Sequence, residues 1–226
     1  DSPPSGQEFD AWTGDTDGVT DVTNSSTTVT MPAEDMEVTA TYKDLTYTVD
    51  YDANGATSGT APDDQTKTHG EDLTLASNTG NLAWTGYTFA GWNTAADGSG
   101  TDYAEGATYD VDADLTLYAK WTVSTYTVTF DLDGKGTRTG GGELSQTVEH
   151  GSAATEPEVE GNAGWSFKGW DPSSFDNVTS NLTVTATYTP SMAGDGTEDN
   201  PYQIQTWYDL NVIRNYLGEN EHFELQ

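Results

Sequence analysis

The sequence predicts a mainly β protein built from small tandem repeat modules, with one short α-helix near its C-terminus. An aromatic cluster followed by an alternating strand runs from Gly86 to Trp121, and a shorter version returns from Gly164 to Tyr188. Self-similarity at a fixed spacing is the signature of a repeat array. Short runs that alternate Thr with Val, Tyr or Phe predict half-buried strands, and Gly/Asp/Asn clusters between them predict turns.

Residues 1–44 match the second half of a module whose first half is missing. Phe9 and Trp12 repeat the spacing of Phe89 and Trp92, and residues 37–42 nearly repeat the closing strand at residues 183–188. We expect this start to be a fragment edge, a processing site or a set of strands that another chain completes. As a hypothesis, a neighbouring copy of the protein supplies the missing strands.

Residues 45–123 form a complete module. The run at 46–51 predicts a half-buried strand, and the Asp, Asn and Gly residues at 52–55 predict a turn, because they tolerate positive φ. A second extended run is expected at residues 65–70, before residues 72–75. An aromatic cluster follows at residues 84–92, and the module ends with the strand at residues 115–121.

Residues 124–190 repeat the same order in a shortened module. Trp170 and Tyr188 are closer in sequence than Trp92 and Trp121, so one turn region has been lost between the cluster and the closing strand. Very short linkers join the modules, which predicts stiff end-to-end stacking rather than flexible beads.

Residues 191–226 comprise a linker and the start of a further domain. Strands are expected at residues 201–204 and 222–225. Between them Thr206 can cap a helix, in which Trp207, Leu210, Ile213 and Leu217 fall at helical spacing.

The pattern YTVxYDANG…HG…GYTFAGWNT…DLTLYAKW resembles the Listeria–Bacteroides repeat, the B-repeat module of internalin-type surface proteins. The resemblance covers residues 47–121 and 126–188, and residues 9–42 resemble a related bacterial repeat. It implies β-grasp-like modules in tandem on secreted or cell-anchored proteins, acting as stalks or adhesive spacers without enzymatic activity. The tail is similar to the entry segment of surface β-helix domains with GLUG-type repeats.

The charge of the chain narrows the classes of partner. The 226 residues carry 38 acidic and 7 basic side chains, for a formal net charge of -31 at pH 7. Nucleic acid and anionic lipid surfaces are disfavoured, because binding them needs clusters of Lys and Arg. No apolar run is long enough to insert into a membrane. High salt, an exterior rich in divalent cations, and a merely solvated acidic surface all fit this charge.

A metal-like motif occurs at Asp50, Asp52 and Asn54. It matches the first half of an EF-hand loop, but position twelve is Ala61 and flanking helices are not expected. A hairpin turn is therefore the favoured interpretation, with weak calcium binding as the alternative, and no other cofactor is expected.

Exposed aromatic rings would be the basis of carbohydrate binding. Trp92, Trp121 and Trp170 recur at matched positions and are predicted to be core, because modules of this size have little else to bury. Trp84 and Tyr103 have no obvious counterparts and are the candidates for binding sugars.

The sequence shows no catalytic motif. It lacks a GxSxG nucleophile motif and cysteine, and His69 and His150 occupy equivalent repeat positions before a glycine, which suggests a role in turns. Possible N-glycosylation sequons lie at Asn24, Asn177 and Asn181.

These observations predict an extracellular, cell-surface structural or adhesive protein, and not an enzyme. Its modules are expected to associate through module contacts and strand edges with other copies of itself or with cell-surface proteins or glycans. The alternative is a carbohydrate-binding accessory region of a secreted enzyme.

Overall fold

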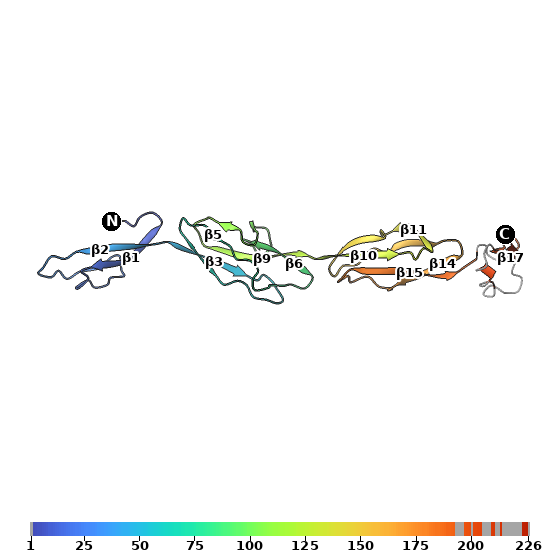
Figure 1. Ribbon diagram of the computed structural model, residues 1–226, viewed down its shortest axis with the longest axis horizontal. Helices are drawn as coiled ribbons and strands as arrows, with labels where there is room; N and C mark the ends of the chain where they lie inside the picture. The colour runs from blue at the N-terminus through green and yellow to red at the C-terminus, as the bar shows by residue number, and fades with distance from the viewer. Residues whose placement is uncertain are drawn as a thin grey trace. The chain divides into compact units, whose positions relative to one another are not determined.

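The computed structural model describes residues 2–192, 197–199, 201–204, 209–210, 213 and 223–225. The chain divides into two compact units, Asp1–Thr122 and Val123–Gln226. Small β-sheets make up both units, which confirms the prediction of a mainly β protein (Figure 1). The helix predicted from Thr206 onwards falls almost entirely outside the described residues.

The first unit contains a five-stranded sheet in the order β4-β3-β9-β6-β7. Its two central strands, β3 and β9, run parallel, with Val49 opposite Leu115 and Tyr51 opposite Leu117. A small sheet formed by β5 and β8 accompanies it. The strands are β3 (Thr46–Asp52), β4 (Gln65–Thr68), β5 (Leu73–Thr74), β6 (Tyr87–Asn93), β7 (Asp102–Tyr103), β8 (Thr108–Tyr109) and β9 (Leu115–Val123).

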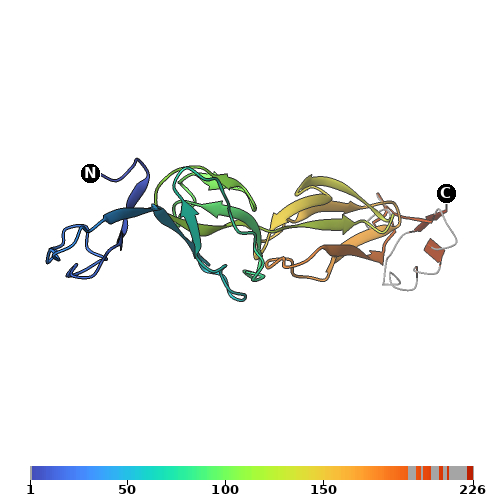
Figure 2. The ribbon, with the colours of Figure 1, turned by 60° about the vertical axis from the view of Figure 1, so that its left-hand side comes forward.

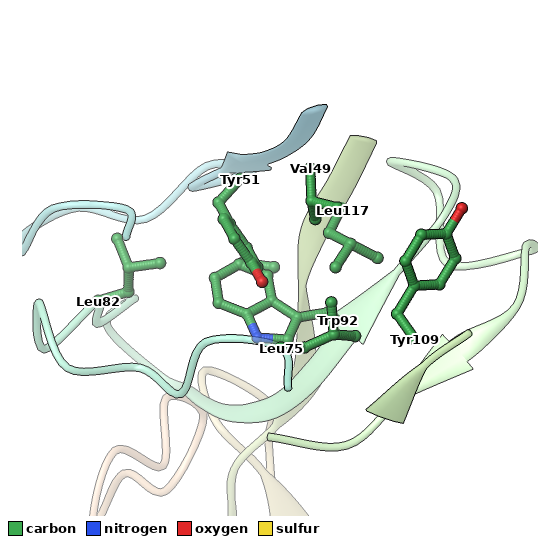
Figure 3. Packing of buried hydrophobic residues seen from close by; sticks show 8 residues of the cluster. Val49, Tyr51, Leu75, Leu82, Trp92, Tyr109 and Leu117 are labelled. Carbon is green, nitrogen blue, oxygen red and sulfur yellow. The ribbon is translucent and has the colours of Figure 1, made fainter. Parts of the chain in front are cut away.

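The core of this sheet is built around Trp92, which is 0% exposed. Alternation along β3 turns Val49 and Tyr51 toward it, since successive side chains of a strand point to opposite faces. The Tyr51 ring lies edge-on to the indole of Trp92 (Figure 3), with 4.8 Å between the ring centroids. The indole N–H donates to the carbonyl of Ala76 at 2.8 Å. Trp92 therefore lies in the core, as its repeated position predicts.

The second unit repeats this arrangement in the four-stranded order β12-β10-β15-β14 (Figure 2). Here β10 and β15 run parallel, with Val128 opposite Leu182 and Phe130 opposite Val184. Phe130 meets Trp170 edge-on at 4.9 Å, as Tyr51 meets Trp92. The strands are β10 (Thr125–Asp131), β12 (Ser145–Glu149), β14 (Trp165–Asp171) and β15 (Leu182–Pro190), with β11 (Gly136–Gly141) and β13 (Pro157–Gly161) forming a second sheet.

An ion pair between a buried lysine and a partly exposed aspartate distinguishes the first complete module from the second. Lys67 is 1% exposed, and its Nζ lies 2.6 Å from Oδ1 of Asp112. Val148 takes the place of Lys67, because each residue faces the tyrosine of the neighbouring strand in the same register. Val148 packs in one apolar cluster with Val178.

The N-terminal module is a two-stranded hairpin of β1 (Gln7–Gly14) and β2 (Val38–Asp44). Its register is that of β14 and β15: Phe9 and Trp12 face Tyr42 and Ala40, as Phe167 and Trp170 face Tyr188 and Ala186. Both hairpins carry an irregularity between the two aromatic residues. The hairpin thus has the strand pairing of the closing half of a complete module.

The C-terminal part contains β16 (Tyr202–Ile204) and β17 (Phe223–Leu225), which pair in parallel. Strands were expected at both places, and the structure confirms them over these residues. His222, the first residue of the expected second strand, lies outside the described residues.

Candidate interaction surfaces

The outer edge of β2 is open. Among the residues that the structure describes, β2 pairs with β1 and with no other strand. The equivalent strands β9 and β15 each pair on that side with a parallel strand, β3 and β10 respectively. The start of β2 at Val38, with Met36 and Glu37 just before it, therefore presents an edge that can accept another strand, since unpaired edge N–H and C=O groups can bond to a partner.

A groove of about 890 Å³ lies against this hairpin. Its apolar part consists of Phe9, Trp12, Val38, Ala40 and Tyr42. The corresponding side chains of the second unit, Val184 and Ala186 among them, are buried in a core. The groove is therefore the unfilled interior face of a module. Its remaining lining residues are Ser2, Pro3, Gln7, Glu8, Ser25 and Thr39.

Trp12 is more exposed and has fewer ring contacts than the equivalent tryptophans of the complete modules. Trp92 and Trp170 are 0% and 8% exposed, whereas Trp12 is only half-buried. Its ring keeps the contact with Phe9 at 5.3 Å, and its indole N–H donates to the carbonyl of Asn24 at 3.0 Å. The second ring contact found in each complete module comes from the parallel strand that β2 does not have.

A second surface is a pocket of about 280 Å³ in the first complete module. Trp84 stacks on Tyr87 at 4.4 Å, and Trp121 meets Trp84 edge-on at 6.0 Å. Asp97 and Lys120 contribute charged groups to the same pocket. Aromatic rings beside polar groups are the composition of a small-molecule site. Asn54, Asn93, Ala95, Ala96, Gly98 and Ala119 complete the lining.

The loop after β6 shapes this pocket, and the second module lacks its counterpart. Asn93 is 1% exposed and anchors the loop, since its side-chain N–H₂ donates to the carbonyls of Gly98 and Gly100 at 3.2 Å. Its side-chain oxygen accepts from the backbone N–H of Ala95 at 2.8 Å. Hydrogen bonds from Ser99, first through its hydroxyl and then through its backbone N–H, lower the pKa of Asp97.

The lysine of this pocket is paired with a carboxylate next to it. Nζ of Lys120 lies 2.6 Å from Oδ2 of Asp102. The hydrogen bond from Lys120, followed by one from Asn93, lowers the pKa of Asp102. Asp102 therefore links Lys120 to Asn93, the residue that anchors the loop.

The structure separates the two predicted sugar-binding residues. Trp84 lines the pocket, but Tyr103 lies on β7 opposite Trp92, packs against the core and meets Tyr109 at 6.2 Å. Sequence reasoning missed Tyr87 and Trp121 as partners of Trp84. The spacing of Tyr87, three residues after Trp84 across a turn, was the available signal.

The motif proposed for calcium forms a turn. Asn54 has a φ of 44°, and its backbone N–H donates to Oδ1 of Asp52 at 2.7 Å. Its side-chain N–H₂ donates to the carbonyls of Ala96 and Ala119 at 2.8 and 2.9 Å. Asp50 lies on β3, on the strand face opposite Val49. In the described part of the chain, no group of three or more His, Asp or Glu residues could hold a metal ion. Calcium binding at Asp50, Asp52 and Asn54 stays a prediction.

The three sequon asparagines, Asn24, Asn177 and Asn181, are all exposed. Asn181 also has a structural contact, because its side-chain oxygen accepts from the backbone N–H of Thr127 at 2.9 Å. Asp114 makes the equivalent contact with Thr48 in the first complete module. Glycosylation at these positions stays a prediction.

These modules and surfaces define a tandem repeat protein whose evident features are sheets, an open edge and an aromatic pocket. The sequence matches the Listeria-Bacteroides repeat domain over residues 47–120 and 126–192, and the divergent InlB B-repeat domain over residues 2–46. Because the first of these matches covers more than half of the chain, the chain belongs to the Listeria-Bacteroides repeat family. The matching domains are non-catalytic repeats.

Similar proteins include two from Evansella cellulosilytica and one from Listeria monocytogenes. A "Putative Gly-rich membrane protein" is 34% identical over 58% of this chain and 16% of its own length, and a "Putative membrane protein" is 40% identical over 39% and 13%. "Internalin H" of L. monocytogenes is 43% identical over 38% of this chain and 14% of its own length. The chain thus spans less than a fifth of each relative. No solved structure shows a significant match.

No helix within the described residues is both long and apolar enough to span a membrane.

Proposed function

We propose that this segment is a non-catalytic structural and adhesive part of an extracellular surface protein, made of β-grasp-like spacer modules. Membership of a repeat family found in bacterial surface proteins such as internalins supports the setting. The parallel pairing of β16 with β17 is compatible with a β-helical domain beginning after the repeats.

The open edge of β2 is the observation that supports an adhesive role. An unpaired strand edge beside an apolar groove is suited to strand addition, in which main-chain hydrogen bonds give affinity and side-chain pockets give specificity. The partner is a strand of another copy or of another surface protein.

Self-association in solution tests this role. The net charge of -31 opposes contact between copies, so association should strengthen as salt shortens the screening length from about 10 Å at 0.1 M to about 3 Å at 1 M. Sedimentation equilibrium should show concentration-dependent dimers of the 226-residue chain at high salt.

A matched pair of variants locates the contact. Val38→Lys places a charge in the groove and should leave the chain monomeric. Met31→Lys makes the same kind of change at a side chain that is 69% exposed and does not line the groove, so it should keep the dimer. A chain that is monomeric at every concentration and salt level, or a dimer that Val38→Lys leaves intact, would refute association through this edge.

A carbohydrate-binding role is the second candidate, and the pocket around Trp84 favours it. Flat rings of Trp84, Tyr87 and Trp121 beside Asp97 and Lys120 suit a sugar, which offers apolar C–H faces and hydroxyl groups.

Glycan-array binding tests this candidate. Binding should be lost in Trp84→Ala and kept in Trp165→Ala, which removes a half-buried indole from the second unit. Loss with Tyr103→Ala but not with Trp84→Ala, with folding intact in both, would place any sugar site away from the pocket.

A further inference from the structure

The register of the N-terminal hairpin fixes which residues of β2 face the missing strand. β1 and β2 pair as β14 and β15 do, with Trp12 taking the place of Trp170 and Ala40 that of Ala186. On this correspondence Val38 takes the place of Val184, and Met36 that of Leu182. Residues 36–39 therefore match the part of β15 that pairs with β10.

Both complete modules put the same kind of strand at this place. Val128 and Phe130 of β10 lie opposite Leu182 and Val184. In the first complete module Val49 and Tyr51 of β3 lie opposite Leu115 and Leu117. The shared pattern is a valine followed two residues later by an aromatic residue, on a strand that runs parallel to the closing strand.

The aromatic residue of that strand packs on the repeated tryptophan. Tyr51 lies 4.8 Å from Trp92 and Phe130 lies 4.9 Å from Trp170, both edge-on. Trp12 has its Phe9 contact, as the other two have Phe89 at 5.1 Å and Phe167 at 5.3 Å. The groove lies where the second ring would be.

Resting on the proposed edge function, we infer that the open edge binds a strand running parallel to β2, with a valine opposite Met36 and an aromatic residue opposite Val38. The aromatic ring packs edge-on against Trp12 and fills the groove. The inference specifies more than an arbitrary partner strand, because it fixes the direction, the register and the side-chain pattern of the strand that binds.

The occupant comes from outside these 226 residues. The two strands of this pattern in the described chain, β3 and β10, are central in their own sheets. The valine and aromatic residue that carry the pattern on each strand are 8% exposed or less, so a copy could donate one only by opening a complete core. A second copy can offer its own open edge, but it does not have this strand to spare.

The turn before β1 shows how a donor would join. Gly6 and Gly164 have φ values of 80° and 85°, and each precedes a strand of the same register. The backbone N–H of Gln7 donates to the carbonyl of Pro4 at 3.1 Å, as that of Trp165 donates to Asn162 at 2.9 Å. Pro4 therefore corresponds to Asn162, and residues 124–161, which contain β10 to β13, precede Asn162 as a donor segment would precede Pro4.

A peptide with the sequence of residues 124–133 tests the inference on the isotope-labelled 226-residue chain. Nuclear magnetic resonance should show shifts at residues 36–39 and at the Trp12 indole. A spin label at the peptide's N-terminus should broaden Met36 most, and one at its C-terminus should broaden Ala40 most. The same peptide with Phe130→Ala should bind at least about tenfold more weakly, because the ring that fills the groove is gone.

The inference would be overturned if the N-terminal label broadened Ala40 most and the C-terminal label Met36, or if the peptide and its Phe130→Ala variant bound equally well. Either result would leave association through the edge standing. If Val38→Lys abolishes the dimer but the peptide does not bind, a second experiment attaches the donor segment covalently, which raises its effective concentration at the edge.

The second experiment joins residues 124–161 directly to Pro4 of the chain. Hydrogen exchange of the edge-facing amides among residues 36–39 should slow by about tenfold or more relative to the 226-residue chain, because these N–H groups gain acceptors on the added strand. The matched fusion with Phe130→Ala in the added segment should show less protection. Unchanged exchange in the first fusion would overturn the inference.

Discussion

The buried pair of Lys67 and Asp112 gives the sharpest stability prediction. Nζ of Lys67 lies 2.6 Å from Oδ1 of Asp112 and 3.1 Å from the carbonyl of Thr68. The side chain of Lys67 is 0% exposed and that of Asp112 is 29% exposed. In Asp112→Val the ammonium group stays buried with the Thr68 carbonyl as its remaining contact. Stranding a buried lysine in this way should cost about 3 kcal/mol, the lower end of the range for breaking a buried pair.

The second module supplies the matched control, because Val148 stands where Lys67 does and packs with Val178. The double variant Lys67→Val with Asp112→Val removes both charges, and it should unfold within about 1 kcal/mol of wild type or be more stable. Lys67→Val alone should cost less than Asp112→Val, because the remaining carboxylate reaches water and keeps the Gly70 N–H at 3.0 Å.

Urea unfolding followed by hydrogen exchange and mass spectrometry measures these differences module by module. A loss of about 3 kcal/mol should lower the urea midpoint of segments from residues 46–123 by roughly 1–3 M. Segments from residues 125–190 serve as an internal reference. If the double variant is as unstable as Asp112→Val, the loss does not come from a stranded charge and the reasoning is refuted.

The remaining predictions concern acid, salt, the tryptophans and two glycines. The hydrogen bond from Lys67, and then that from Gly70, holds the pKa of Asp112 below its ordinary value of 3.8. The stability that the ionised carboxylate contributes is therefore present above the unfolded pKa and is lost as pH falls through the folded pKa. Acid titration below about pH 4 should show this loss of stability in wild type and not in the double variant. Raising salt from 0.1 to 1 M should raise the melting temperature, since the net charge of -31 repels itself; a lower melting temperature would argue against this. Trp92→Ala should cost about 3–5 kcal/mol in urea unfolding, and Trp12→Ala clearly less, because only the first leaves a full cavity; equal losses would contradict an open groove. Gly91→Ala should lower the melting temperature more than Gly70→Ala. Both glycines have positive φ, but of the two only at Gly91 would a Cβ meet a backbone oxygen, that of Tyr103 at 2.6 Å. A larger loss in Gly70→Ala would contradict this packing.

Local patterns predicted the strands and the core tryptophans. Alternation along residues 46–51 and 125–130 reflects the two-residue period of a strand, which depends on neighbours in sequence alone. The repeated positions of Trp92 and Trp170 indicated burial because a side chain that every module repeats is the simplest core residue.

Long-range pairing was beyond the sequence. The parallel contact of β3 with β9 joins segments separated by five other strands, and no local pattern specifies its register. The Lys67–Asp112 pair and the grouping of Trp84 with Tyr87 and Trp121 arise only once that sheet forms. For the same reason Tyr103 was predicted to be an exposed ring like Trp84, although it lies on β7 opposite Trp92 and packs against the core.

The N-terminal hairpin pairs its strands as a closing half-module does, and the outer edge of β2 is open in the described structure. Hydrogen exchange of the dilute monomer compares residues 36–39 with residues 182–185 in one sample. The edge-facing amides of residues 36–39 should exchange at rates close to those of an unprotected chain, while their counterparts in β15 stay protected by β10. Equal protection of the two segments in a monomer would show that the edge is already covered and would contradict the account.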